Sequence, residues 1–175
     1  MGYVRDQINN YLKKHRYCVL CTCVGDESRA TPVRYQADDL NIIIYSERFT
    51  RKFFYLRKNR TVTIALHSTR SPIQGLQLWG TAEVITHRDP RHAAHLFPEA
   101  KRSAKLQEAC KVLNLILVTP RRIVMLDQVP GRGYRYYVWE QDKRGRETER
   151  EVKTIRELSR LQSRRFTEAC SNRPS

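Results

Sequence analysis

Short β-rich runs, each ended by a turn, follow one another through most of this 175-residue sequence. They lie at 18–24, 30–36, 40–46, 61–67, 76–86, 115–119, 122–127 and 134–140, with Pro120 expected to break the pair at 115–127. Neither an alternating strand–helix rhythm nor a Gly-rich nucleotide loop accompanies them, which disfavours a doubly wound sheet. The pattern predicts a mainly β fold, a six- to seven-stranded antiparallel barrel with flanking helices.

The expected helices lie between these runs and after them. Apolar residues at helical spacing predict helices at 4–15, 51–58, 90–97, 101–112 and 149–170. Hydrophobic residues make up 40% of the chain, enough for one sizeable core. We therefore expect a barrel domain over residues 1–140 and a charged helical extension over residues 141–175.

The balance of charge is strongly basic. Lys and Arg number 33 against 18 Asp and Glu, so the formal charge is +15, which first suggests an anionic partner. Residues 141–175 hold ten basic and six acidic residues and so account for only +4 of it, whereas residues 48–60 hold six basic residues. The sequence shows neither an apolar run of membrane-spanning length nor a signal-peptide pattern, and we expect a cytoplasmic protein without membrane contact.

Three cysteines stand close together at Cys18, Cys21 and Cys23. On a strand, Cys18 faces away from the other two, and a second ligand pair at zinc-like spacing is missing. We therefore favour small buried side chains over a metal or redox role, and we predict no metal site.

The start of the helix at 51–58 is the most informative position in the sequence. Thr50 is the expected N-cap, and Arg51 and Lys52 occupy the first turn, where the helix already carries partial positive charge. Basic residues are unfavourable there unless a phosphate binds. Phosphate binding and a solvated basic face are, from this block alone, equally supported.

The order of these pieces resembles the FMN-binding split barrels related to pyridoxamine 5′-phosphate oxidase, from about Tyr11 to Ile123. The residues that carry the resemblance are 17–24, 29–35, 42–46, 50–52, 76–82 and 117–123. The resemblance implies an FMN-binding split barrel, with FMN as cofactor and a role as an oxidoreductase acting on a small-molecule redox substrate. It also implies a homodimer with flavin at the subunit interface.

The resemblance assigns roles to individual residues. The flavin ring would lie along the backbone of Thr31, Pro32, Val33 and Arg34, with Tyr45 and Ser46 flanking the ring and ribityl chain. Thr50, Arg51 and Lys52 would hold the phosphate, and Gln77 or Gln74 would reach the flavin from a later strand. Arg34 is the expected cation beside the ring.

The sequence departs from the oxidase itself. That enzyme ends in a substrate-phosphate pattern of Arg and His, which has no match around residues 132–139. We therefore expect a relative of the oxidase rather than the oxidase. Two alternatives stay open: a non-enzymatic binding module for nucleic acid or another polyanion, with nucleic acid disfavoured because its motifs are missing, and a haem- or deazaflavin-binding split barrel.

Overall fold

The computed structural model describes residues 2–47, 49–68, 72–94, 108 and 113–161. Within them, eight strands form one antiparallel sheet in the order β3-β2-β1-β4-β5-β6-β7-β8. The strands are β1 (Tyr17–Val24), β2 (Glu27–Asp38), β3 (Asn41–Ser46), β4 (Thr61–Ser68), β5 (Gln74–Ile85), β6 (Asn114–Val129), β7 (Gly133–Gln141) and β8 (Glu147–Val152).

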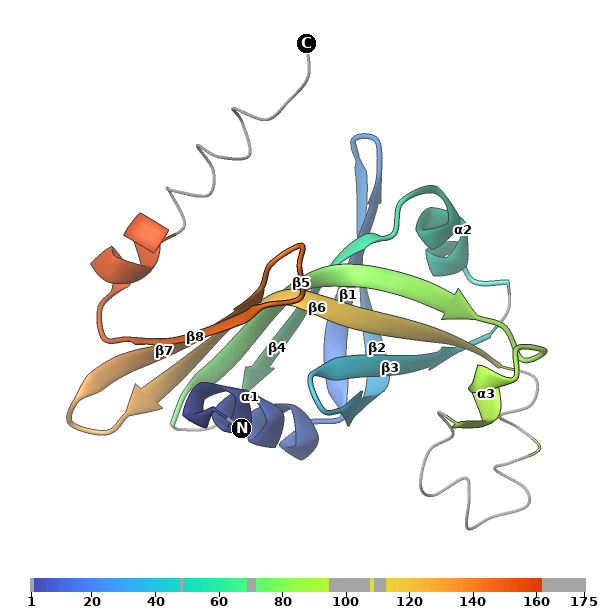
Figure 1. The fold of residues 1–175 in the computed structure, drawn as a ribbon. Helices are drawn as coiled ribbons and strands as arrows, with labels where there is room; N and C mark the ends of the chain where they lie inside the picture. The colour runs from blue at the N-terminus through green and yellow to red at the C-terminus, as the bar shows by residue number, and fades with distance from the viewer. Residues whose placement is uncertain (1, 48, 69–71, 95–107, 109–112, 162–175) are drawn as a thin grey trace.

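The first six strands close into a barrel because β3 also pairs with β6 (Figure 1). Strands β7 and β8 continue the sheet outward from β6. The predicted antiparallel barrel is thus confirmed, with a six-stranded closed part and two outer strands.

Inward-facing and outward-facing side chains alternate along each strand, and the inward-facing ones form the core. Leu20, Ile64 and Leu78 lie opposite one another on β1, β4 and β5, and all three are completely buried. Their sequence neighbours point to the outer face, as the pleat requires. Cys18 belongs to the inward set and is buried, and Cys21 and Cys23 face the opposite side, as predicted. The prediction that all three are buried is wrong for Cys21 and Cys23, which are half-buried because the outer face of β1 is partly open to solvent.

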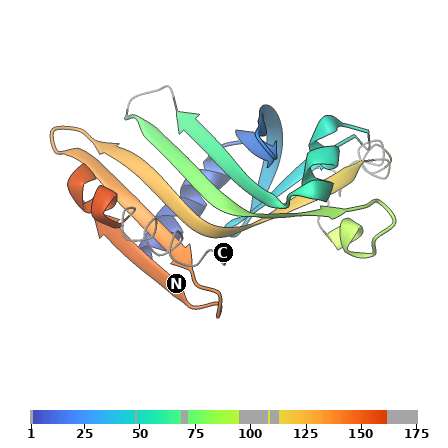
Figure 2. The same ribbon diagram turned by 90° about the horizontal axis from the view of Figure 1, so that it is seen from above.

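Helices α1 (Tyr3–Lys14) and α2 (Arg51–Lys58) lie on different sides of the barrel, and α3 (Arg91–Ala94) follows β5 (Figure 2). Helix α1 buries Val4, Ile8, Tyr11 and Leu12 at the spacing that the sequence predicts. The predicted helix at 101–112 lies outside the described residues except for Glu108. No helix among the described residues is long and apolar enough to cross a membrane.

The predicted break at Pro120 is wrong, because β6 runs through it as one strand of 16 residues. The ladder between β5 and β6 shifts register at Trp79 and Gly80, so that Gly80 lies opposite Pro120 and Trp79 opposite Arg122. Arg121 is the extra residue of this bulge. A bulge is one of the few places where a strand tolerates a proline, which has no N–H for the ladder.

The predicted helix at 149–170 is also wrong at its start. Residues 147–152 form β8, which pairs with β7, and helix occupies 155–161 instead; residues 162–170 lie outside the described residues. Val152, which the helical pattern counted with Leu158, sits opposite Tyr136 in the sheet. Val152 and Leu158 nevertheless pack in one apolar cluster with Val138. The apolar pattern therefore predicted correctly that both side chains are buried, but it placed Val152 in a helix instead of a strand.

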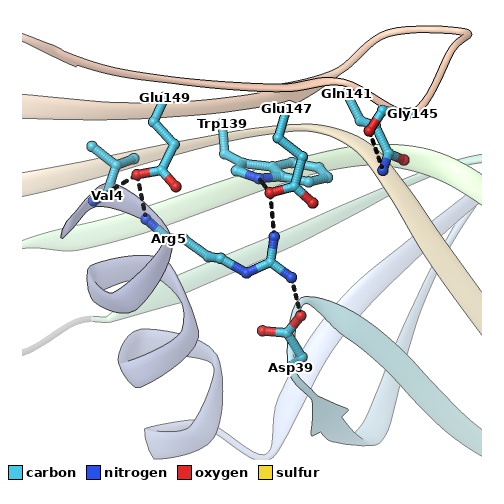
Figure 3. A network of polar contacts seen from close by, with 8 residues as sticks. All are labelled: Val4, Arg5, Asp39, Trp139, Gln141, Gly145, Glu147 and Glu149. Atoms are coloured by element: carbon cyan, nitrogen blue, oxygen red, sulfur yellow. Dashed lines mark hydrogen bonds and ion pairs between the residues drawn. The ribbon is translucent and has the colours of Figure 1, made fainter. Parts of the chain in front are cut away.

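Strand β8 ties the N-terminal helix to the barrel through a polar network (Figure 3). The carboxylate of Glu149 accepts hydrogen bonds from the backbone N–H groups of Val4 (3.1 Å) and Arg5 (3.2 Å). It therefore caps α1, whose N-cap Gly2 has no side chain for this role.

The Arg5 side chain completes this network. Its guanidinium forms ion pairs with Asp39, in the turn between β2 and β3, and with Glu147 of β8. Glu147 also accepts a hydrogen bond from Trp139 Nε1 at 3.1 Å. One arginine thus joins three segments that are far apart in the sequence.

Gly80→Ala should destabilise the barrel. A Cβ at Gly80 would overlap the carbonyl oxygen of Thr119 and lie 3.1 Å from Pro120 Cα, both backbone atoms that cannot rotate away. We expect the free energy of unfolding in urea to fall by about 1–3 kcal/mol. Gly75→Ala is the matched control on the same strand, because its Cβ would lie 3.7 Å from the Leu66 carbonyl oxygen. Equal effects of the two substitutions would contradict the predicted clash.

Glu147→Gln should make the protein less sensitive to acid. The hydrogen bond from Arg5 lowers the pKa of Glu147, with a smaller lowering from Trp139. A carboxylate whose pKa is depressed by folding stabilises the protein above its unfolded pKa, and this stability is lost as the pH falls through the folded pKa. The melting temperature, followed from about pH 7 to about pH 3 across the ordinary glutamate pKa, should drop less in the variant than in the wild type. An unchanged slope for Glu147→Gln would refute the prediction.

Candidate functional site at the start of helix α2

Four residues separate the end of β3 from the start of α2, and this connection brings polar groups of both elements together. The helix is anchored by Phe53, Tyr55 and Leu56, which are buried. Its first turn holds no acidic residue, and its last turn holds Arg57 and Lys58, as the helix dipole favours. The helix dipole therefore explains the positions of Arg57 and Lys58 but not those of Arg51 and Lys52.

Three side chains of this connection form a chain of hydrogen bonds. Lys52 Nζ donates to Ser46 Oγ at 2.8 Å, and Ser46 Oγ lies 3.3 Å from Thr50 Oγ1. Thr50 Oγ1 also donates to the carbonyl oxygen of Glu47 at 3.3 Å. Thr50 occupies the predicted N-cap position, but its hydroxyl makes no capping bond to the helix. We refer to Ser46, Thr50 and Lys52 as the Lys52 cluster.

The electrostatics of the Lys52 cluster favour an anion. Burial lowers the pKa of Lys52, and the nearby Glu47 carboxylate offsets this lowering in part. Ser46 is 7% exposed, so the ammonium points toward a site that water reaches poorly. The donor set consists of an ammonium, two hydroxyl groups and a helix N-terminus, with the exposed Arg51 fork beside it. Such a set fits a phosphate.

The central part of β2 carries the residues expected along the flavin ring. The ladder between β2 and β3 ends at Tyr35 and Ile44, two residues short of Val33 on β2 and of Ser46 on β3. The Val33 side chain packs against the barrel core. Pro32 and Arg34 point the other way and are exposed, while Thr31 is half-buried. Only the backbone and the outer side chains of this segment are available to a ligand, as the resemblance implies.

Two other predicted positions lie away from the Lys52 cluster. Tyr45 is on the opposite face of β3 from Ser46 and packs against a second apolar cluster with Ile43 and Leu115. Gln77 is exposed on the outer face of β5, in one row with Pro32 through Val19 and Ala65. Three strand spacings separate Gln77 from Pro32, about 14 Å. The alternative residue, Gln74, donates to Asp127 Oδ1 at 2.8 Å.

The structure adds an open cavity that the sequence did not reveal. It measures about 590 Å³, and its lining joins Thr50 and residues of α2 to the segment after β5. Its lining includes Phe49, Phe53, Phe54, Arg57, Arg88 and Asn114. The phenylalanines and Arg57 stand in the basic block at 48–60, but the opposite wall depends on sheet register, which spacing along the chain does not show.

Comparison with known proteins bears on this geometry. The family model described as pyridoxamine 5′-phosphate oxidase matches residues 4–126, which is most of the chain. The chain belongs to the pyridoxamine 5′-phosphate oxidase family. The matched segment contains β1 to β5 and all but the last three residues of β6, and it includes the Lys52 cluster.

Solved structures of the family share the fold at low sequence identity. A pyridoxamine 5′-phosphate oxidase-related, FMN-binding protein from Nostoc punctiforme has a TM-score of 0.62 and 10% identity, covering 86% of this chain and 93% of its own. PhzG from Burkholderia lata, solved with tetrahydrophenazine-1-carboxylic acid, has a TM-score of 0.58 and 16% identity, covering 83% of this chain and 85% of its own. An FAD-binding protein from Mesorhizobium loti has a TM-score of 0.56 and 13% identity, covering 71% and 92%. No curated protein matches the sequence.

Proposed function

We propose that the protein binds FMN with its phosphate at the Lys52 cluster and acts as a flavin-dependent oxidoreductase. The observation that carries the proposal is the half-buried Lys52 ammonium, which donates to Ser46 in front of a helix start that has no acidic residue. The family membership and the FMN-binding relative from Nostoc punctiforme support it.

In this proposal the protein supplies position and charge. Bound FMN would supply the transfer of electrons or hydride. Lys52, Thr50 and Ser46 would hold the phosphate, with the guanidinium of Arg51 beside it. The backbone from Thr31 to Arg34 would hold one edge of the ring, and the Arg34 guanidinium would balance negative charge there. The substrate would be a small redox-active molecule, and the protein would be a relative of the oxidase with a different substrate.

Replacing Lys52 tests the phosphate site. Lys52→Met should weaken FMN binding by roughly 10- to 100-fold, because one charge-assisted hydrogen bond to the phosphate is lost. Binding of riboflavin, which lacks the phosphate, should be unchanged. Titration of the flavin-free protein with each ligand, followed by flavin fluorescence, gives both affinities.

Lys58→Met is the matched control, because Lys58 lies at the other end of α2 with its ammonium 4.6 Å from the Phe54 ring centroid. Equal losses for FMN and riboflavin in Lys52→Met would remove the phosphate assignment. A wild-type protein that binds no flavin, but binds DNA with an affinity that falls steeply with salt, would favour the polyanion alternative. Visible spectra after addition of haem or a deazaflavin test the remaining alternative.

A homodimer is part of the proposal. In the proposal the flavin ring lies along β2, and Gln77 of the same protomer lies three strands away, about 14 Å from Pro32. A second protomer would bring its own Gln77 to the flavin held by the first. The outer face between them carries small uncharged side chains, among them Val19, Cys21 and Thr63, which suit a sheet-to-sheet contact.

Thr63→Arg should separate the proposed dimer. Thr63 lies opposite Cys21 on the outer face, where an added guanidinium would have to be buried between two sheets. Sedimentation velocity should show the wild type at twice the 20.7 kDa chain mass and the variant at the chain mass, with weaker flavin binding. Thr148→Arg on the outer strand β8 is the control and should remain dimeric. A monomeric wild type that binds FMN tightly would contradict the interface.

A further inference from the structure

The exposed face of helix α2 carries positive charge and an aromatic ring. On the opposite face, Phe53 and Leu56 pack into the main core of the barrel. Phe54, Arg57 and Lys58 are exposed. Arg57 and Lys58 follow Phe54 by three and four residues, the spacings at which side chains of a helix lie next to each other. A purely solvated helix face usually mixes charges of both signs, whereas this helix holds no acidic residue.

Cations beyond the helix extend this charge. Arg60 follows α2 and is exposed, and Arg88 comes from the segment after β5 and lines the cavity of about 590 Å³ together with Arg57. Asn114 holds that segment in place, since its side-chain oxygen accepts a hydrogen bond from the His87 backbone N–H at 3.3 Å. Arg57 and Arg88 therefore line one cavity from two elements that are far apart in the sequence.

These cations have no negative partner in the described part of the chain. Four of them form no ion pair there: Arg57, Lys58, Arg60 and Arg88. On the second wall of the cavity, Asp89 and Glu83 both pair with Arg91, at 2.7 and 2.8 Å. Their charge is thus already balanced, and the four cations are left to a ligand.

Two phenylalanine rings are exposed beside these cations. Phe49 is completely exposed and Phe54 is 56% exposed, and both line the cavity. The Lys58 ammonium lies 4.6 Å from the centroid of the Phe54 ring, so a cation already accompanies that ring. Leaving such rings in water forgoes the stabilisation that their burial would give. Aromatic rings between cations are the arrangement with which proteins hold single-stranded nucleic acid.

We propose that these side chains form a binding surface for single-stranded nucleic acid. We call it the α2 surface and define it by six residues: Phe49, Phe54, Arg57, Lys58, Arg60 and Arg88. Its cations contact the phosphates of the strand and its rings stack on the bases, without preference for a sequence. The proposal goes beyond the flavin function, because the α2 surface shares no residue with the Lys52 cluster.

The charge and shape of the α2 surface favour this ligand over others. Four separate cations exceed what one small anion can neutralise, whereas a nucleic acid strand supplies one charge per nucleotide. An anionic membrane also supplies charge, but a bilayer is flat and the cavity that Arg57 and Arg88 line is concave. The motifs whose absence from the sequence disfavours nucleic acid are not needed here, because every base offers a face for stacking.

Binding of a fluorescein-labelled strand of about twelve thymidine nucleotides to the full-length chain tests the proposal. Fluorescence anisotropy should show saturable binding. The logarithm of the affinity should fall with the logarithm of the salt concentration with a slope of about −3, as four phosphate contacts predict, and Arg57→Gln should reduce this slope to about −2. Phe54→Ala and Phe49→Ala should each weaken binding by roughly 5- to 100-fold, because the stacking of a base is lost.

The turn between β6 and β7 supplies matched controls. It carries an exposed arginine, Arg132, and an exposed aromatic residue, Tyr134, at the end of the molecule away from α2 (Figure 1). Arg132→Gln and Tyr134→Ala remove the same kinds of group and should leave the affinity for the strand unchanged. Inorganic polyphosphate of similar length has charge but no bases, so it should bind equally well to the wild type and to Phe54→Ala. An equal loss for polyphosphate and for the strand would refute base stacking.

Three results would overturn the proposal. The first is a strand that does not bind even at low salt, and the second is a loss in the variants of the α2 surface no larger than that in the controls. The third is binding to vesicles of phosphatidylserine and phosphatidylcholine with none to the strand. Lys52→Met should weaken FMN binding and leave binding of the strand unchanged, so failure of one proposal does not decide the other. Thermal unfolding of each variant shows whether its fold is intact, which these exposed positions should preserve.

Discussion

The pairing of β3 with β6 is the constraint on which the rest of the structure depends. It joins strands about 70 residues apart along the chain and closes the six-stranded barrel, which leaves β1 to β6 without an open edge on that side. The last pair of this ladder is Ser46 with Asn114. Ser46 belongs to the Lys52 cluster and Asn114 to the lining of the cavity, so closure of the barrel also brings the cluster and the cavity wall together.

The burial of a charged group at the candidate site makes the folded protein less stable. Burial of the Lys52 ammonium lowers its pKa, which means that the charged form is less favourable there than in water. Ser46 supplies one hydrogen bond in compensation. A bound phosphate would supply the negative charge that the Lys52 ammonium lacks. Lys52 would then stabilise the ligand-bound protein, although it destabilises the free protein. The Arg5 network on the other side of the barrel is different in kind, because its carboxylate partners are already present.

Most of the barrel could be predicted from the sequence for two reasons. Apolar and polar residues alternate along half-buried strands, and turn-forming residues mark where the strands end. Strand β3 and helix α2 were predicted almost to the residue. The failures have physical causes. Pro120 was expected to end a strand, but the bulge opposite Gly80 accommodates it, and a bulge depends on the partner strand. Residues 147–152 were expected to be partly helical. They form a strand instead, because they pair with the free edge of β7.

The sequence by itself determined most of the succession of strands and the basic start of α2 at Thr50, Arg51 and Lys52, because these depend on residues within a few positions of each other. Only the tertiary structure decided that Ser46 joins Thr50 and Lys52 in one cluster, that Gln77 lies across the sheet from Pro32, and that Arg88 and Asn114 line one cavity with α2. It also decided that Tyr45 faces away from the Lys52 cluster. These facts depend on strand register and on closure of the barrel. Both are set by the packing of residues that are distant in the chain, which local patterns do not encode.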